Sequence, residues 1–409
     1  MKCRHCGSEL KLPFVDLGSA PPSNAYLQEE NLQAAEKWYP LRVLVCTHCW
    51  LVQTEDFAER DELFNADYAY FSSLSSTWLA HAERYVEDMA QRFGLNANSH
   101  VVEVAANDGY LLQYVKAHHI PCTGVEPTGS TAKAARAKGI PIEEEFFGVN
   151  LAKELVTQGK QADLTTANNV LAHVPDINDF VAGFALLLKP SGVATFEFPH
   201  LLKLIEGNQF DTIYHEHFSY LSLISVQRIF ETNGLTVFDV EELPTHGGSL
   251  RVFAQRCNSG KHACMSRVAK VIEREKHAGM ETTEYYTDFQ VRAEKVKDDI
   301  LLFLIDAKRQ GKTVAAYGAA AKGNTLLNFA GIRPDLLPYV CDAAPSKQGK
   351  YLPGSHIPIL APSALQKYKP DFIIIIPWNI AEEVKQQNAN VREWGGRFLV
   401  AVPSLCVLT

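Results

Sequence analysis

The sequence predicts an α/β protein made of a short cysteine-bearing segment and two larger units built on mostly parallel sheets. Strand-like apolar segments alternate with helical ones between residues 100 and 256, and a second alternation begins at residue 313. Such alternation is typical of doubly wound sheets, which bind ligands at the carboxyl ends of their strands. We therefore expect an N-terminal module, a central α/β domain and a C-terminal α/β domain, at residues 1–65, 66–256 and 257–409.

The individual elements follow from runs of apolar residues and from helical periodicity. In the central domain we expect strands at residues 100–105, 122–127, 140–147, 162–167, 192–199, 235–240 and 250–255. Helices are expected there at residues 77–93, 110–115 and 177–188. In the C-terminal domain we expect strands at residues 313–317, 337–341, 372–376 and 398–402.

The composition is that of an acidic globular chain. Its 409 residues are 46% hydrophobic and 21% charged, with a net charge of -8. A general nucleic-acid binder usually shows a basic face, so we expect no nucleic-acid partner. The sequence has neither a long uncharged apolar run nor an apolar leader at its N-terminus, which favours a cytoplasmic protein without a membrane partner.

Four of the nine cysteines form two C-x-x-C pairs, Cys3 with Cys6 and Cys46 with Cys49. One such pair lets two thiolates reach one ion, and two pairs complete a tetrahedral four-sulfur shell. We expect a structural Zn²⁺ here, because no coordination position is left open for water. A redox motif is the alternative, but it would place one pair on a strand-to-helix turn. Irregular loops are expected around the prolines between the pairs, Pro21, Pro22 and Pro40.

A strand, a turn with a single glycine and a helix follow one another in the segment from Glu103 to Leu111, and Glu126 ends the next strand. A close backbone turn and a carboxylate for a ribose diol suit a nucleoside ligand. The turn lacks G-x-G-x-x-G, so S-adenosylmethionine fits better than NAD, although Glu126 could be a solvated strand end. The expected cofactor-binding residues are Glu103, Ala105, Asn107, Gly109, Tyr110, Leu111, Glu126, Pro127, Asn168 and Asn169.

The segment F-D-T-I-Y-H-E-H-F-S-Y, from Phe210 to Tyr220, holds a dense cluster of proton-transfer groups after the fifth strand. H-E-H lacks the helical spacing of a zinc-protease motif, so we favour catalysis over metal binding or a solvated loop. His173 follows the fourth strand and either faces the same cleft or is satisfied within its own loop. The residues alone do not choose between His215 and His217 as a base.

A second strand–turn–helix runs from Val314 to Thr325. Its turn matches G-x-G-x-x-G except at Ala320, and Asp342 follows at the distance of a ribose-binding acid. Loss of the middle glycine counts against NAD, because that glycine lets the backbone approach a pyrophosphate. A helix N-terminus beside Lys322 could still hold the diphosphate of a nucleotide sugar.

Taken together, these motifs resemble those of the nucleotide-sugar C-methyltransferases, which add the C-3 branch methyl of deoxysugars. Besides the four cysteines, the resemblance is carried in order by E-V-A-A-N-D-G-Y-L-L, G-V-E-P, N-N-V-L-A-H-V, F-D-T-I-Y-H-E-H-F-S-Y, H-G-G-S-L-R and G-A-A-A-K-G-N-T-L. It covers essentially the whole chain. It implies a Rossmann-like S-adenosylmethionine methyltransferase as the central domain and a Rossmann-like C-terminal domain that binds the nucleotide of a TDP-4-keto-deoxysugar.

The resemblance also implies roles for single residues. His217 would be the general base, with Tyr214, Glu216, His173 and Tyr68 around the sugar. We expect further substrate contacts from His215, His246, Lys322, Asn324, Lys347 and Lys350. The family favours a monomer, with a homodimer as the alternative.

The chemistry fits these roles, because a carbon becomes nucleophilic only when a neighbouring carbonyl lets it lose a proton. A 4-keto group does so for C-3, and the enzyme must supply a base and donors for the enolate oxygen. Two other classes are kept as alternatives: an NAD-dependent nucleotide-sugar oxidoreductase or epimerase, and a zinc-containing nucleic-acid methyltransferase.

Overall fold

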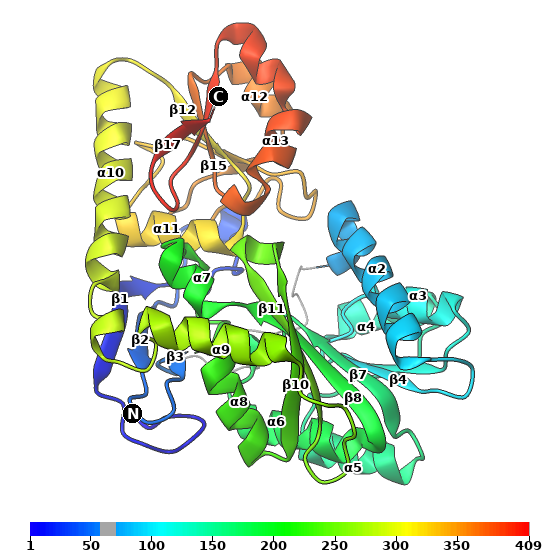
Figure 1. Cartoon of the computed structure of the whole chain (residues 1–409). Coiled ribbons are helices and arrows are strands. Elements are labelled where there is room, and N and C mark those ends of the chain that lie inside the picture. The colour runs from blue at the N-terminus through cyan, green and yellow to red at the C-terminus, as the bar shows by residue number, and fades with distance from the viewer. Residues whose placement is uncertain (58–70, 409) are drawn as a thin grey trace.

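The structure, a computed structural model, describes residues 1–57 and 71–408 of the chain. These residues form three sheets, one for each of the three expected parts (Figure 1). Among the described residues, none of the helices has the length and apolar character needed to span a bilayer.

The N-terminal module is built on an antiparallel sheet of order β1-β2-β3-β9. Its strands are β1 (Leu12–Ala20), β2 (Tyr39–Val45), β3 (Val52–Thr54) and β9 (Ser219–Tyr220). The expectation of an irregular loop at Pro40 was wrong, since this residue pairs with Ser19 within β2. Here Phe14, Val15 and Leu17 are buried. Strand β9 comes from the central domain. It brings the end of the segment from Phe210 to Tyr220, called the H-E-H segment below, into this sheet.

The central sheet has the order β10-β11-β8-β7-β4-β5-β6. Its strands are β4 (Val101–Val104), β5 (Cys122–Val125), β6 (Ile142–Glu143), β7 (Ala162–Asn168), β8 (Leu188–Pro199), β10 (Leu235–Leu243) and β11 (Ser249–Arg256). All pairs from β6 to β8 are parallel, and β11 is antiparallel to both neighbours. The strand order reverses between β4 and β7, which confirms the predicted doubly wound sheet. Sheets of this kind bind ligands at the carboxyl ends of the strands beside such a switch point.

Helices surround this sheet because their apolar faces match its two apolar surfaces. They are α2 (Ser76–Phe93), α3 (Leu112–Ala117), α4 (Gly129–Ala137), α5 (Val149–Thr157), α6 (Ile177–Leu187) and α8 (Leu223–Thr232). Helix α7 (Leu201–Glu206) instead packs in the apolar cluster that contains residues of β1 and α10 (Phe289–Arg309). Ser222 caps α8 in a reciprocal capping box with Ser225. The buried carboxylate of Glu275 also accepts the backbone N–H groups of Leu223 and Ile224, at 2.7 and 2.9 Å.

The C-terminal sheet has the order β14-β13-β12-β15-β16-β17 and is parallel except at β17. Its strands are β12 (Val314–Tyr317), β13 (Val340–Cys341), β14 (Ile359–Leu360), β15 (Phe372–Ile375), β16 (Arg397–Val400) and β17 (Cys406–Leu408). Its helices are α11 (Ala321–Ala330), α12 (Ser363–Tyr368) and α13 (Ala381–Gln387). A second switch point lies between β12 and β15, so a second ligand crevice is expected where these strands end.

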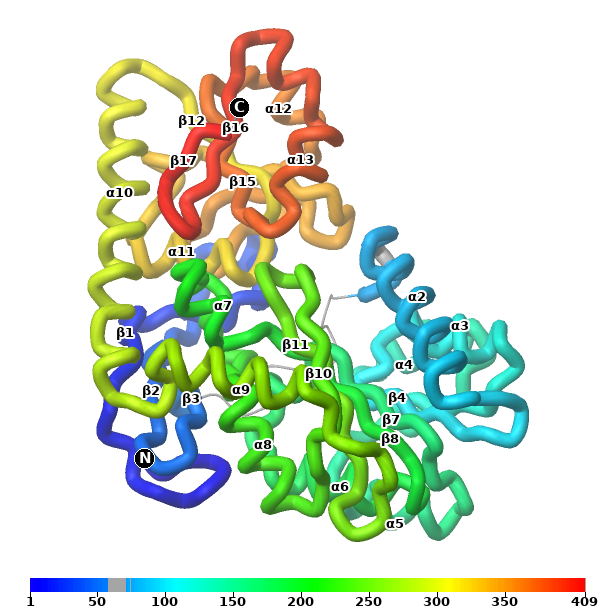
Figure 2. Tube along the Cα trace, in the orientation of Figure 1, coloured from blue at the N-terminus to red at the C-terminus, as the bar shows by residue number. Residues whose placement is uncertain are grey.

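Two helices join the parts of the molecule. Helix α9 (Ser266–Ala278) packs on β10 and α8 of the central domain. Helix α10 (Phe289–Arg309) runs from the N-terminal module to the C-terminal sheet and packs on β1 and α11 (Figure 2). One continuous apolar core therefore extends from β1 through α10 to the C-terminal sheet.

Candidate active site

The four patterned cysteines come together in the N-terminal module. Their sulfur atoms all lie within 4.8 Å of one another, with 3.5 Å from Cys3 to Cys49 and from Cys6 to Cys46. Zn–S bonds of about 2.3 Å in a tetrahedron require S–S distances of about 3.8 Å, so the four thiolates fit one zinc ion. The buried amide of Gln53 also donates to Cys3 Sγ at 3.3 Å. With four thiolates the shell is closed, as in a structural site.

This zinc module holds the end of the H-E-H segment. Strand β3 begins three residues after Cys49 and pairs Gln53 with Ser219 and Val52 with Tyr220. The hydroxyl of Thr54 donates to the carbonyl oxygen of His217 at 3.2 Å. The metal site and the candidate catalytic loop are therefore joined by a short, buried strand.

At the first switch point, Glu126 holds the turn after β4. One of its carboxylate oxygens accepts the N–H of Asn107 and the other that of Thr128, each at 2.9 Å. Ala105 and Asn107 have φ of 60° and 50°, so the turn adopts a left-handed backbone that the Glu126 contact stabilises. Each carboxylate oxygen keeps a lone pair that could accept a ribose hydroxyl.

The surroundings of this turn suit a cationic nucleoside such as S-adenosylmethionine. Glu103, at the end of β4, is 1% exposed, and burial raises the pKa of its carboxyl well above its usual range. A cationic ligand nearby would favour its ionised form. Across the switch point, Asn169 Oδ1 is buried without a hydrogen-bond partner among the described residues. At Gly109, a Cβ would lie 2.4 Å from Ile140 Cδ1, so the chain packs closely there.

The other expected cofactor residues lie in or next to the turns at the carboxyl ends of β4, β5 and β7. Tyr110 and Leu111 are buried, Pro127 is half-buried, and Asn168 accepts the Thr166 hydroxyl at 3.2 Å. Asn107 has a second role, since its side-chain oxygen accepts the N–H of Ser72 at 2.9 Å.

Aromatic side chains from α2 pack beside the turn that follows β4. Trp78 stacks on His81, with ring centroids 4.8 Å apart, and on Tyr110 at 6.0 Å. His81 Nε2 lies 3.0 Å from the buried carboxylate of Glu197, at the end of β8. The rings of His246 and Trp78 form a T-shaped contact with centroids 5.6 Å apart. Within the described ranges, His246 Nδ1 has no hydrogen-bond partner. Burial lowers the pKa of His246 to about 4, so its ring is neutral.

His217 lies where the three parts of the molecule meet. Its Nδ1 is 2.8 Å from the Thr212 carbonyl oxygen, and its ring centroid is 4.0 Å from that of Tyr214 and 4.6 Å from that of His173. Burial and the neighbouring His173 hold the pKa of His217 well below its usual value. Burial likewise lowers the pKa of His173 to about 4. Both rings are therefore neutral at pH 7, as a general base must be.

The two residues before His217 face the zinc module. His215 Nε2 lies 3.2 Å from the Tyr39 carbonyl oxygen and 3.3 Å from that of Pro40. Glu216 is buried and accepts the Asn24 amide at 2.6 Å. The structure therefore brings His217, Tyr214 and His173 together, whereas His215 and Glu216 bind the N-terminal module. Tyr68 lies outside the described residues.

At the second switch point, Asp342 repeats the arrangement of Glu126. Its carboxylate accepts the N–H of Ala319 at 2.7 Å and that of Ala344 at 2.8 Å. Lys347 Nζ donates to the Ala319 carbonyl oxygen at 2.8 Å, and the Tyr26 hydroxyl donates to the same oxygen at 2.6 Å. A loop of the zinc module thus packs on the turn that the sequence predicts for a nucleotide.

The remaining expected substrate residues lie on both sides of this turn. Lys322 Nζ sits 4.4 Å from the Trp378 ring centroid and donates to Asn379 Oδ1 at 2.7 Å. Asn324 is buried and donates to the Ser23 carbonyl oxygen at 2.6 Å, so it joins α11 to the zinc module. Lys350 is half-buried, and its N–H bonds to the Lys347 carbonyl oxygen at 3.1 Å.

Several residues of this junction were not among the sequence-based candidates. They are Asn24, Tyr26, Trp78, His81, Glu197 and Trp378. Glu197 and Trp378 could have been found, since Glu197 lies near the carboxyl end of β8 and Trp378 follows β15 at the second switch point. Asn24 and Tyr26 carry no such signal, because their place depends on how the zinc module docks.

Comparisons with known families cover most of the chain. Residues 3–64 match the family described as "Putative zinc binding domain", residues 78–240 match "Methyltransferase domain", and residues 244–403 match "C-methyltransferase C-terminal domain". With the fold and the cysteine cluster, these matches define an S-adenosylmethionine-dependent methyltransferase that carries a zinc site.

Two curated proteins give the relationship in more detail. The C-methyltransferase NovU of Streptomyces niveus is 35% identical over 408 residues, 100% of this chain and 97% of its own length. The chain therefore belongs to the C-methyltransferase family. The ubiquinone biosynthesis O-methyltransferase of Bordetella avium is 25% identical over 143 residues, 32% of this chain and 59% of its own length. Neither the oxidoreductase nor the nucleic-acid alternative is supported by these matches.

Among solved structures, the fold is similar to that of magnesium protoporphyrin IX methyltransferase from Synechocystis PCC 6803 with bound SAH. That structure has a TM-score of 0.35 and 14% identity, and it covers 44% of this chain and 83% of its own.

Proposed function

We propose that the enzyme transfers a methyl group to C-3 of a nucleotide-linked 4-keto-deoxysugar, in branched-chain deoxysugar biosynthesis. The observation that carries this proposal is the group of neutral, half-buried side chains around His217 at the junction of the three parts. Acid–base chemistry at a carbon needs such a base, because C-3 must lose a proton before it can attack a methyl group.

His217 would remove the C-3 proton through Nε2, since Nδ1 donates to the Thr212 carbonyl oxygen. The rings of Tyr214 and His173 flank it and would donate hydrogen bonds to the enolate oxygen. Bound S-adenosylmethionine supplies the methyl group to the resulting carbon nucleophile. The turn held by Glu126 would bind and orient this donor, so that much of the acceleration comes from positioning.

The nucleotide would bind at the second switch point. The backbone turn after β12, with Lys322 and Lys347 beside it, suits a diphosphate at a helix N-terminus. The contacts of Asp342 support nucleotide binding at this turn. Its carboxylate accepts backbone N–H groups of the turn after β12, as Glu126 does at the turn after β4. The sugar would then extend from the C-terminal crevice toward His217.

A screen of TDP-4-keto-deoxysugars with isotope-labelled S-adenosylmethionine tests the proposal. We expect one of these sugars to gain a labelled methyl group at C-3, seen in the product mass and its fragments. If no 4-keto sugar is methylated while another carbon acid is, the substrate class is wrong. Calorimetric titration with NAD serves as the control, with no binding expected.

A further inference from the structure

We propose that the C-terminal domain positions the general base, because Trp378 and Thr325 hold the turn whose carbonyl group orients His217. This inference rests on the proposed function, since it takes His217 as the base. Both residues act through backbone and side-chain contacts of the H-E-H segment. Neither needs to touch the sugar, so they are positioning residues.

The first contact joins Trp378 to Asp211. Trp378 follows β15, and its indole Nε1 donates to Asp211 Oδ2 at 2.8 Å. Asp211 is 1% exposed, so its carboxyl group depends on protein donors. Removing the indole N–H would leave this oxygen buried without that donor, which favours a shift of the turn around Asp211.

The second contact lies two residues further along the turn. The hydroxyl of Thr325, in α11, donates to the Ile213 carbonyl oxygen at 2.7 Å, and Thr325 is 2% exposed. Asp211 and Ile213 directly flank Thr212, whose carbonyl oxygen accepts His217 Nδ1 at 2.8 Å. The carbonyl group that orients the base is therefore bracketed by two hydrogen bonds from the C-terminal domain.

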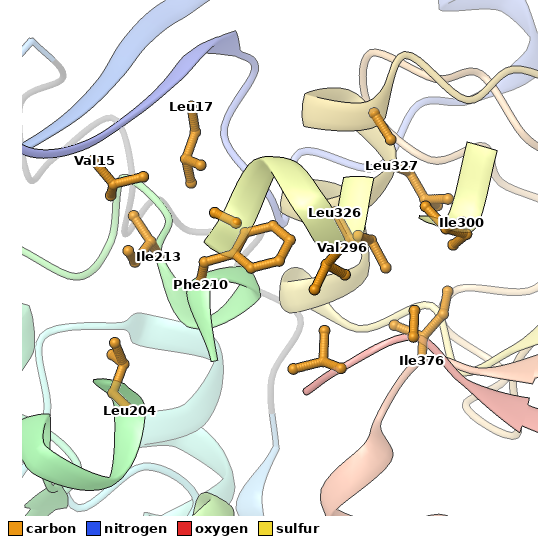
Figure 3. Close-up of a cluster of buried hydrophobic side chains, with 14 of the residues drawn as sticks. Val15, Leu17, Leu204, Phe210, Ile213, Val296, Ile300, Leu326, Leu327 and Ile376 are labelled. Carbon is orange, nitrogen blue, oxygen red and sulfur yellow. The ribbon is translucent and has the colours of Figure 1, made fainter. Parts of the chain in front are cut away.

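Apolar packing also holds the turn at residues 210–213 in place. Phe210 and Ile213 lie in a buried cluster with Val296 of α10 and Leu326 of α11 (Figure 3). Val296 and Leu326 come from the C-terminal side of the molecule, and Val15 and Leu17 of β1 belong to the same cluster. The turn thus belongs in sequence to the central domain but packs between the N-terminal module and the C-terminal domain.

The Trp378 ring itself is held in one orientation. Lys322 Nζ lies 4.4 Å from its centroid on the side of α11. On the side of the β10–β11 hairpin, Gly247 has φ of 87°, and a Cβ there would lie 2.5 Å from Trp378 Cη2. Only glycine permits this close approach, so the hairpin fixes the indole that holds Asp211.

The first test needs no sugar. In protein labelled with ¹⁵N-histidine, the His217 ring signals, assigned by their loss in H217N, report its tautomer. We expect the wild type to show the Nδ1–H form alone and W378F to show both tautomers. W394F is the matched control, because Trp394 Nε1 donates to the Pro370 carbonyl oxygen at 3.0 Å in the same domain. Wild-type His217 signals in W378F would overturn the proposal, whatever the substrate is.

The second test is kinetic and uses the sugar found in the screen. A base displaced by about 1 Å can cost about 100-fold in rate, so W378F should lose kcat on this scale with little change in KM. T325V should lose kcat likewise, and T325S, which keeps the hydroxyl, should retain it. A raised KM with unchanged kcat in W378F would instead make Trp378 a substrate ligand and overturn the positioning role. If the wild type methylated none of the sugars, that result would count against the proposed function. The NMR test would still decide whether Trp378 positions His217.

Discussion

The Nδ1 atom of His217 lies 2.8 Å from the carbonyl oxygen of Thr212 in the same loop. A carbonyl oxygen can only accept, so Nδ1 carries the proton and Nε2 keeps the basic lone pair. His215 has the opposite arrangement, with Nε2 facing the carbonyl oxygens of Tyr39 and Pro40. The two histidines of H-E-H therefore use different nitrogen atoms and face different parts of the molecule.

The activity of the enzyme should persist into mildly acidic solution. Burial and His173 hold the pKa of His217 well below 6.5, so the ring stays neutral, and hence basic, as the pH falls through 6.5. The acid limb of kcat/KM should lie below this value. Since a lowered pKa keeps the deprotonated form at lower pH, a limb at or above 6.5 would contradict the assignment.

Asp211 could produce an inflection of its own, because burial raises the pKa of its carboxyl to about 6. The variant D211N keeps an oxygen acceptor for the Trp378 N–H but does not titrate. We expect D211N to remove any inflection near pH 6 from the pH profile of kcat/KM. The acid limb that His217 produces at lower pH should remain.

Loss of one zinc ligand should affect both stability and turnover. In C46S the metal content and the melting temperature should fall together, because the free energy of metal binding is part of the free energy of folding. Activity should fall as well, since β3 pairs with β9, which directly follows the segment that carries the proposed base His217. The exposed Cys257 provides the control variant C257S, which should behave as wild type. A C46S protein that lost zinc but kept its melting temperature would contradict a structural site.

Replacing Glu126 should weaken binding of S-adenosylmethionine. Hydrogen bonds to a charged group contribute about 1.5–3 kcal/mol each, so E126A should lower cofactor affinity by tens-fold or more in a calorimetric titration. Part of this loss would come from the Asn107 turn, which Glu126 also holds. The matched variant D342A removes the same contacts at the second switch point. D342A should weaken binding of the nucleotide sugar and leave the affinity for S-adenosylmethionine unchanged. If both variants lowered the cofactor affinity equally, Glu126 would not be the cofactor-binding carboxylate.

The two parallel sheets could be predicted from the sequence because each strand is a short apolar run between turn residues. Phe372–Ile375 and Val101–Val104 form strands where they were expected. Strands β14 and β17, of two and three residues, were not predicted. The sheet of the zinc module was also missed, because its prolines resemble those of loops and β9 joins from a distant segment.

The candidate site could be predicted only in part. Acidic residues at strand ends, such as Glu126, follow from the topology of a doubly wound sheet. Spacing could not separate His217, the proposed base, from His215, since their different hydrogen-bond partners and ring neighbours depend on the fold. The role proposed for Trp378 depends on the packing of the C-terminal domain against the turn at Asp211, which spacing in the sequence does not indicate.

Exchange of the C-3 proton with solvent tests the role of His217 most directly. In deuterated water without methyl donor, the wild type should replace this proton in the bound 4-keto sugar, as followed by NMR or mass. General-base contributions are about 10²–10⁴-fold, so H217N should exchange slower by that factor while still binding both ligands. H215N, the matched variant, should keep exchanging. Wild-type exchange in H217N together with its loss in H215N would contradict the account and assign the base to His215.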